Sequence, residues 1–436
     1  MASEILYAWG PGETRLALVR DGRLVDLAVL RPELLVGAVL LGRVVEVAPK
    51  MGAVFVDIGQ DRPGFLQGVK LTQGQTVLVQ VKSDAQGLKG ATLTTQVTLS
   101  GRFMAYTPSH PGLAVPRKLS DDRRALLTER LEALMAEGEG VVARLHAVNA
   151  DADALAADLA ALRQDWQAIL RDQPQAKAPA VLWRPDPLDR MLADHPGVSK
   201  VLVDDDLAFA QVQARYPHLA ERYRDGSVFD LYDTEDAFAA CLDPVVELPC
   251  GGRVTIEATA ALTAIDVDSG PAQPIEANQQ AVTVIARHLR LRNIAGQVVV
   301  DFVTAGGKGA LMKLMASLKQ AISTDPVATH VIGATPLGLV EMTRERRGPS
   351  LAELMVEQAA IANIDTVALW ALRLLRSEAA HRPGRALALV VAPEVAAALE
   401  ARPQALDDLT QRLGRAPVIR IEADRDRDNV AVEEVE

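Results

Sequence analysis

Three aspartates stand where two apolar runs of the sequence end. The stretch AIDVDSG, residues 264–270, carries Asp266 and Asp268, and the stretch GQVVVDFV, residues 296–303, carries Asp301. Both runs have the composition of a β-strand and a helical pattern separates them, so we expect a strand, helix, strand unit. Because strand side chains alternate, Asp266 and Asp268 should share one face, and Asp301 could close the same site.

Carboxylates at strand ends can face a cleft and hold a divalent cation, whereas a carboxylate in an apolar core must be paired or neutralised. No cluster of His or Cys accompanies the three aspartates, which favours Mg²⁺ or Mn²⁺ over Zn²⁺. The same spacing also has a structural interpretation, because aspartates at strand ends cap helices and start turns. The spacing alone leaves both interpretations open.

Basic residues gather after the strand-like stretch GLVEMT. Arg344, Arg346 and Arg347 form the densest basic cluster of the chain and are the best candidates for contacts to phosphates. The predicted helix at 276–293 carries further arginines, which suit either a solvated face or neutralisation of a nucleic-acid backbone. The aspartate run at 204–206 is interpreted as the solvated start of a helix.

A β-rich segment with two phenylalanines follows residue 35. Its strands are predicted at 39–47, 53–58 and 76–81. Strand alternation places the valines of GAVFVDIG in the core and Phe55 on the opposite face. Phe55 and Phe65, with Arg62 and Lys89 nearby in the sequence, are therefore candidates for stacking on and binding the bases of a single-stranded nucleic acid. The alternative is that both rings are ordinary core.

The composition sets limits on the class of protein. A chain of 436 residues that is 49% hydrophobic can bury large cores in two or more domains. Its two cysteines, Cys241 and Cys250, have neither metal-ligand nor disulfide spacing, which favours a reducing cytoplasm. The net charge of -11 argues against a protein that coats nucleic acid, although local basic strips can still steer RNA. We expect no secretion signal and no membrane span.

Several motifs together resemble the bacterial ribonuclease E/G family over nearly the whole chain. The stretches ALTAIDVDSG, ARHLRLRNIAGQVVVDFV and GLVEMTRERRGPSL are similar to its catalytic subdomain, and GAVFVDIG and RPGFL to its RNA-binding barrel. In that family two aspartates hold the catalytic magnesium, and here they match Asp266 and Asp301. Asp268 stands where the family usually has asparagine and would hold the ion or a metal-bound water.

The resemblance implies a Mg²⁺-dependent endoribonuclease that cuts single-stranded RNA in RNA processing or decay. The metal would orient and activate a water for in-line attack, leaving 5′-phosphate and 3′-hydroxyl ends. The alternative is a catalytically weak RNA-binding protein that acts in RNA or ribosome assembly. A DNA-directed nuclease is disfavoured because the barrel resembles an RNA-binding one.

Two family features are altered in this sequence. The family senses a 5′-monophosphate with an arginine followed by a threonine, which match Arg144 and Leu145 here. An apolar side chain cannot donate a hydrogen bond to phosphate, so we expect the sensor to be impaired. Where the family has two zinc-binding cysteines, LAELMVEQAAIANIDT has none, so no structural Zn²⁺ is expected and a homodimer would form otherwise, through the C-terminal domain.

The expected fold is a multidomain α/β protein. Its parts are an RNase H-like scaffold at 1–35 and 179–242, an S1/OB-type RNA-binding barrel at 36–98, a 5′-sensor-like region at 99–178, a DNase I-like catalytic subdomain at 243–350, a linker without zinc ligands at 351–358, and a small C-terminal α/β domain at 359–436, whose charged end is expected to fray.

Overall fold

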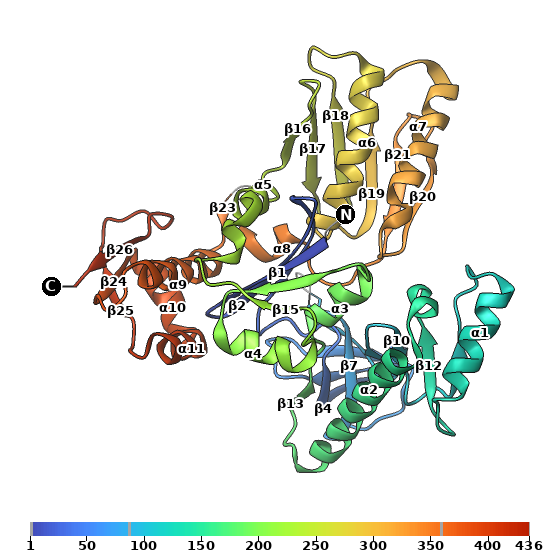
Figure 1. Cartoon of the computed structure of the whole chain (residues 1–436), viewed down its shortest axis with the longest axis horizontal. Helices are drawn as coiled ribbons and strands as arrows, with labels where there is room; N and C mark the ends of the chain where they lie inside the picture. Colours follow the sequence, from blue (N-terminus) through green and yellow to red (C-terminus); the bar gives the residue numbers. More distant parts are fainter. Residues whose placement is uncertain (1–2, 86–88, 358–360, 436) are drawn as a thin grey trace. The chain divides into compact units, whose positions relative to one another are not determined.

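The computed structural model describes residues 3–85, 89–357 and 361–435, and the chain forms two compact units (Figure 1). One unit comprises Met1–Pro32 and Val198–Glu436, and the other comprises Glu33–Gly197. The second unit is therefore inserted into the chain of the first. Within the described residues, no helix is long and apolar enough to cross a membrane.

The inserted unit begins with a closed β-barrel. Its sheet runs in the order β13-β4-β5-β6-β8-β7 and closes through pairing of β4 with β7. The strands are β4 (Val39–Ala48), β5 (Ala53–Asp57), β6 (Gly64–Gln67), β7 (Thr76–Ser83), β8 (Thr92–Thr94) and β13 (Ala180–Trp183). Val54, Val56 and Ile58 are buried, as alternation predicts, and the OB-like barrel is confirmed.

Strand β13 belongs to a different part of the chain than the sequence predicts. Residues 179–242 were assigned to the scaffold, but β13 pairs antiparallel with β4 of the barrel. The compact unit that contains the barrel extends to Gly197. Within 179–242, the residues that belong to the same compact unit as β1 begin at Val198.

The remainder of the inserted unit is a small sheet with helices. The sheet has the order β11-β12-β10-β9. The elements are β9 (Leu99–Ser100), β10 (Met104–Tyr106), β11 (Gly112–Ala114), β12 (Gly140–Ala143), α1 (Asp121–Glu132), α2 (Ala152–Asp172) and α3 (Pro187–Asp194). Helix α1 begins after Ser120 and ends at Glu132. Leucines of α1 and α2 share one core with this sheet.

The first unit is built on a five-stranded mixed sheet of order β15-β14-β1-β2-β3. Its elements are β1 (Ser3–Gly10), β2 (Glu13–Arg20), β3 (Arg23–Leu30), β14 (Lys200–Val203), β15 (Ala220–Arg222), α4 (Asp206–Arg215) and α5 (Thr234–Ala240). Strands β2 and β3 form a hairpin, and its turn residues Asp21 and Gly22 have φ values of 50° and 73°. Two successive positive φ values suit the twist of a tight hairpin.

The aspartates at 204–206 are more buried than the sequence interpretation predicts. Only Asp206 is solvated; Asp205 caps α4 through the Leu207 and Ala208 amides and is buried. Asp204 is buried too, where it accepts hydrogen bonds from the Trp9 and Val228 amides and pairs with Arg376. The predicted helix start is therefore confirmed, because α4 begins at Asp206, but the prediction that the run is solvated is wrong for Asp204 and Asp205.

A six-stranded sheet of order β16-β17-β18-β19-β21-β20 follows. Its elements are β16 (Val245–Glu247), β17 (Arg253–Ala258), β18 (Thr263–Asp268), β19 (Gly296–Asp301), β20 (Thr329–Ala334), β21 (Val340–Arg344), α6 (Pro274–Leu291) and α7 (Gly307–Ala321). Figure 1 shows α6 and α7 beside this sheet, and buried residues of both helices share a core with alternate strand residues. The helices thus cover one face, and the remaining strand residues point to the other.

The C-terminal part begins with a short helix and hairpin and ends in a three-stranded sheet of order β25-β24-β26. Its elements are α8 (Leu351–Met355), β22 (Val356–Glu357), β23 (Ile361–Ala362), α9 (Ile364–His381), β24 (Leu387–Val391), α10 (Pro393–Glu400), α11 (Pro403–Leu413), β25 (Val418–Ile421) and β26 (Ala431–Glu434). The small α/β composition agrees with the expectation.

Two features of this part were not expected. The predicted linker at 351–358 starts as helix α8, which a capping box of Ser350 and Glu353 stabilises, while residue 358 lies outside the described residues. Contrary to the expected fraying, residues 431–434 of the charged end form β26, which pairs antiparallel with β24. Backbone pairing of this kind depends on the neighbouring strand and not on the hydrophobicity of the tail.

Candidate active site

Asp266 and Asp301 are partners in the parallel ladder of β18 and β19. Ile265, Val267 and Val300 point into the helix-covered core, so both aspartates lie on the opposite face, and both are exposed. Neighbouring strands lie about 4.8 Å apart, which places the two carboxylates within reach of one small cation. The predicted strand, helix, strand unit is confirmed, and Asp301 lies on the same face of the sheet as Asp266.

The two carboxylates fit a hard divalent ion. In the described part of the chain neither Asp266 nor Asp301 forms an ion pair or a side-chain hydrogen bond. Their oxygens are therefore available as ligands, and oxygen ligands suit Mg²⁺ or Mn²⁺. Adjacent like charges on an exposed surface are unfavourable without a cation, which gives the pair a reason to bind one.

Asp268 is arranged differently from the other two aspartates. Its Oδ2 accepts from Arg253 Nη2 at 2.9 Å, and its Oδ1 accepts from the Gly270 amide at 2.9 Å. Among the described residues, no three Asp, Glu, His or Cys side chains converge as a metal site would require. Asp268 is thus on the predicted face, but both of its oxygens are already engaged.

Asn278 supports the strand end that carries Asp301, and the sequence analysis missed it. The Asn278 side chain is buried in α6. Its Nδ2 donates to the Val303 carbonyl at 2.8 Å, and its Oδ1 accepts from the Val303 amide at 3.1 Å. A polar residue on the apolar face of an amphipathic helix was the available signal. These two bonds fix the backbone two residues beyond Asp301.

In the basic cluster at 344–347, the structure differs from the expectation for Arg344. Arg344 is buried, and its Nε lies 2.9 Å from Asp325 Oδ2 while its Nη1 donates to the Ile294 carbonyl. Burial raises the pKa of Asp325, but the hydrogen bond and charge of Arg344 outweigh it, and the net pKa is lowered. The predicted phosphate contact is therefore wrong for Arg344, because its side chain is only 2% exposed.

The other two arginines of this cluster lie nearer to solvent. Arg346 pairs with Glu353 at 3.0 Å, and Arg347 donates to the Pro326 carbonyl at 2.8 Å. Both side chains are half-buried. Each would have to exchange a protein contact for a phosphate, and their role stays a prediction.

The aromatic residues of the barrel lie together. Phe55 of β5 and Phe65 of β6 are directly opposite in the antiparallel ladder. Their ring centroids are 5.9 Å apart at an interplanar angle of 61°, an edge-to-face pair. Both are half-buried, Arg62 is half-buried and Lys89 is exposed. The pair thus differs from the fully buried valines of the same strand, and stacking on RNA stays a prediction.

Arg144 and Leu145 follow the last residue of β12. The Arg144 Nε donates to the Gly101 carbonyl at 3.1 Å, and its amide donates to the Phe103 carbonyl. Leu145 is 49% exposed. Arg144 therefore supports the loop at 101–103, while the neighbouring position presents an apolar side chain to solvent.

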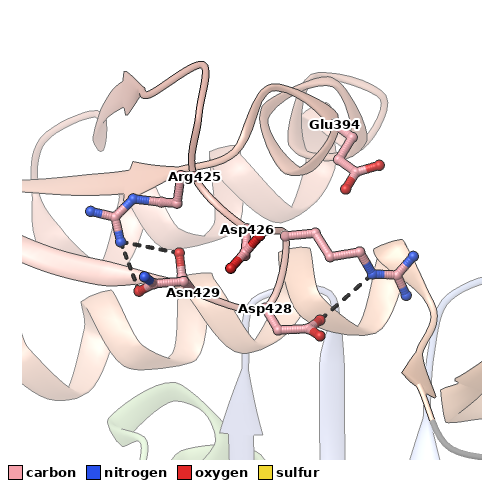
Figure 2. A pocket seen from close by; sticks show the side chains of 6 residues that line it. Glu394, Arg425, Asp426, Asp428 and Asn429 are labelled. Atoms are coloured by element: carbon pink, nitrogen blue, oxygen red, sulfur yellow. Dashed lines mark hydrogen bonds and ion pairs between the residues drawn. The ribbon is translucent and has the colours of Figure 1, made fainter.

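A pocket lies in the C-terminal part, away in sequence from every predicted site residue (Figure 2). It is lined by Glu394, Arg425, Asp426, Arg427, Asp428 and Asn429. Figure 2 shows Arg425 directed at Asn429, with the Arg425 Nη1 to Asn429 Oδ1 distance at 2.9 Å. The pocket groups residues of the β25–β26 connection with Glu394 of α10 and contains none of the candidate catalytic residues.

An OB-like barrel and an exposed aspartate pair on an α/β sheet define a class of multidomain protein suited to nucleic-acid binding and metal-dependent chemistry. Residues 98–347 match the Ribonuclease E/G family. Ribonuclease G of Haemophilus influenzae is 30% identical over 403 residues, 82% of each chain. Since the family match spans more than half of the sequence, the chain belongs to the ribonuclease E/G family.

Further relatives extend the similarity to both named branches of the family. Ribonuclease G of Escherichia coli K12 is 29% identical over 457 residues, covering 92% of this chain and 93% of the relative. Ribonuclease E of Nostoc sp. is 32% identical over 378 residues, covering 78% of this chain and 55% of the relative. The similarity to ribonuclease G thus covers both chains almost completely.

Proposed function

We propose that this chain is a divalent-metal-dependent endoribonuclease that cuts single-stranded RNA in RNA processing or decay. The observation that carries the proposal is the register pairing of Asp266 and Asp301, exposed on one sheet face. Membership of the ribonuclease E/G family supports the substrate class. The proposed products are 5′-phosphate and 3′-hydroxyl ends.

The residues of the sheet and of helix α6 have separate tasks in this proposal. Asp266 and Asp301 would hold the cation, with Mg²⁺ the first choice and Mn²⁺ the second. When bound, such an ion supplies Lewis-acid stabilisation of the phosphodiester and an activated water. Asn278 keeps the backbone after Asp301 in place through its two bonds to Val303. Preorganised ligands of this kind hold the reacting groups in position.

The barrel would bind the RNA strand by stacking. Phe55 and Phe65 offer two rings in register, and Arg62 and Lys89 offer positive charge near them in the sequence. Aromatic stacking accepts any base, which suits binding to single strands without strong sequence preference.

The order of the strands in two sheets supports a more specific proposal for the fold. An antiparallel β1–β2–β3 meander with β14 and β15 parallel to β1 suits an RNase H-like scaffold. The mixed six-stranded sheet with α6 and α7 would be the DNase I-like subdomain. We also propose a cytoplasmic location, supported by the free Cys241 and Cys250, and a homodimer formed through the C-terminal domain.

The test is cleavage of labelled single-stranded RNA by purified protein with Mg²⁺, with Mn²⁺ or with EDTA, followed by analysis of the product ends. Cleavage should require the metal and disappear in Asp266→Asn. Glu257→Gln removes an exposed carboxylate from the neighbouring strand β17 and is the matched control. RNA binding without cleavage under any of these conditions would refute the enzyme and support the RNA-binding alternative.

A further inference from the structure

Arg253 and Asp268 form a cross-strand ion pair beside the proposed metal site. They are direct partners in the antiparallel ladder of β17 and β18, and their side chains meet at 2.9 Å. Val254 and Val267 point into the core, so the pair lies on the face that carries Asp266. Asp268 lies two positions from Asp266. By pairing with Asp268, Arg253 can determine which carboxylates bind a cation.

The ion pair between Arg253 and Asp268 has a larger effect on the net charge of the proposed metal site than on the stability of the fold. The side chains are 56% and 44% exposed, and exposed ion pairs contribute little to folding. Asp266, Asp268 and Asp301 together carry three formal negative charges, and the charge of Arg253 reduces the sum to two. Two negative charges balance one divalent cation without repelling an incoming phosphodiester further.

The local geometry also selects Asp268 as the partner of Arg253. Arg253 lies between two carboxylates, since Glu247 of β16 is its partner in the other ladder. Within the described residues Glu247 forms no ion pair, while Asp268 receives both Arg253 and the Gly270 amide. Two donors on its two oxygens hold the Asp268 carboxylate in one orientation.

We propose that Arg253 is a positioning residue for the metal site. By pairing with Asp268 it keeps that carboxylate out of the ligand set and leaves Asp266 and Asp301 as the two uncompensated ligands. This inference rests on the proposed function, and it replaces the expected role of Asp268 as a metal ligand. Asp268 and Arg253 then act as a unit that sets the charge of the site.

Direct titration of metal, without RNA, tests the inference. Mn²⁺ binding is followed by electron paramagnetic resonance and Mg²⁺ binding by calorimetry for the wild type and six variants. Asp268→Asn leaves Arg253 uncompensated and should weaken binding about fivefold, whereas Arg253→Ala frees a third carboxylate and should strengthen it about fivefold. The double variant should return to within about twofold of the wild type, because the two charges cancel. Glu247→Gln, the flanking carboxylate without the ion pair, should leave binding unchanged.

The outcomes separate this inference from the proposed function. If Asp268 is itself a ligand, the double variant stays as weak as Asp268→Asn, and the inference is overturned. It is also overturned if Arg253→Ala does not change the affinity. Arg253→Lys keeps the charge and should behave as the wild type, which guards against a loss of folding in the alanine variant. Retained metal binding in Asp266→Asn would instead refute the proposed metal site, whatever the result for Arg253.

Discussion

Asp266 and Asp301 are 35 positions apart in the sequence and are direct partners in the parallel ladder of β18 and β19. A parallel pair requires a crossover connection, which α6 provides on the covered face of the sheet. Because the crossover lies on one face, the opposite face is left for the two aspartates. The topology thus explains why an acidic pair can be exposed on two strands whose other face is buried.

Asp301→Asn should abolish RNA cleavage and leave the fold intact. The change removes one charged ligand from a hard cation while keeping the volume of the side chain. The measurement is the cleavage rate of labelled single-stranded RNA at saturating Mg²⁺, with the thermal unfolding midpoint as the check on folding. Substantial cleavage by the folded variant would remove Asp301 from the metal site.

Phe55→Ala combined with Phe65→Ala should weaken RNA binding, at roughly 1–3 kcal/mol per stacked base. The two rings are in register and half-buried, so one stretch of bases can use both. Fluorescence anisotropy with a labelled oligoribonucleotide measures the affinity. The matched control replaces both residues by tyrosine, which keeps the rings. An unchanged affinity together with a lower unfolding midpoint in the alanine variant would show that both rings only stabilise the barrel.

Local patterns were sufficient to predict much of the fold. The Asp21-Gly22 turn, the barrel strands and the shared face of Asp266 and Asp268 all follow from rules that act over a few residues. The family resemblance supplied the order of the parts, because neither composition nor periodicity indicates which sheets belong together.

The sequence does not indicate which charged residues or strands become partners when they are far apart in the chain. Asp204 is buried and pairs with Arg376, 172 positions away, and Arg344 is buried and pairs with Asp325. A charged residue is expected to be exposed unless it has a partner of opposite charge. Strand β26 was missed for the same reason, since its pairing partner β24 is far away in the sequence.

Glu13→Gln should destabilise the scaffold strongly at neutral pH. Glu13 is buried and pairs with Arg15 at 2.6 Å, Arg31 at 2.9 Å and Arg373 at 3.3 Å. Removal of one partner from a buried ion network costs roughly 3–5 kcal/mol, because the remaining charges lose their compensation. Urea unfolding at pH 7 measures the loss, and Glu257→Gln, an exposed carboxylate of the same unit, is the control. A loss below about 1 kcal/mol would contradict the network's role.

The same glutamate gives the stability a pH dependence. Burial alone would raise the pKa of Glu13, but the positive charges of Arg15, Arg373 and Arg31 outweigh it and lower the pKa to about 2 from 4.5. The contribution of a group with a lowered pKa is complete above its unfolded pKa and is lost as the pH falls through the folded value. The difference in unfolding free energy between wild type and Glu13→Gln should therefore be constant above about pH 5 and shrink between about pH 4.5 and pH 2. A difference that does not change with pH over that range would refute this assignment.

The 5′ end of the RNA should have little influence on the rate of cleavage. A preference for a 5′-monophosphate requires donors to the phosphate, and each charge-assisted hydrogen bond contributes about 1.5–3 kcal/mol. Leu145 provides no donor and is 49% exposed next to Arg144, whose Nε already donates to the Gly101 carbonyl.

We therefore expect 5′-hydroxyl and 5′-monophosphate substrates to be cut at similar rates when they compete in one reaction. Leu145→Thr restores the missing hydroxyl and should introduce a preference for the monophosphate, while Leu145→Val, of similar size to threonine and without a donor, should not. A tenfold or greater preference in the wild type that is lost in Arg144→Ala would show that Arg144 binds the phosphate without a second donor, and the argument from Leu145 would be wrong.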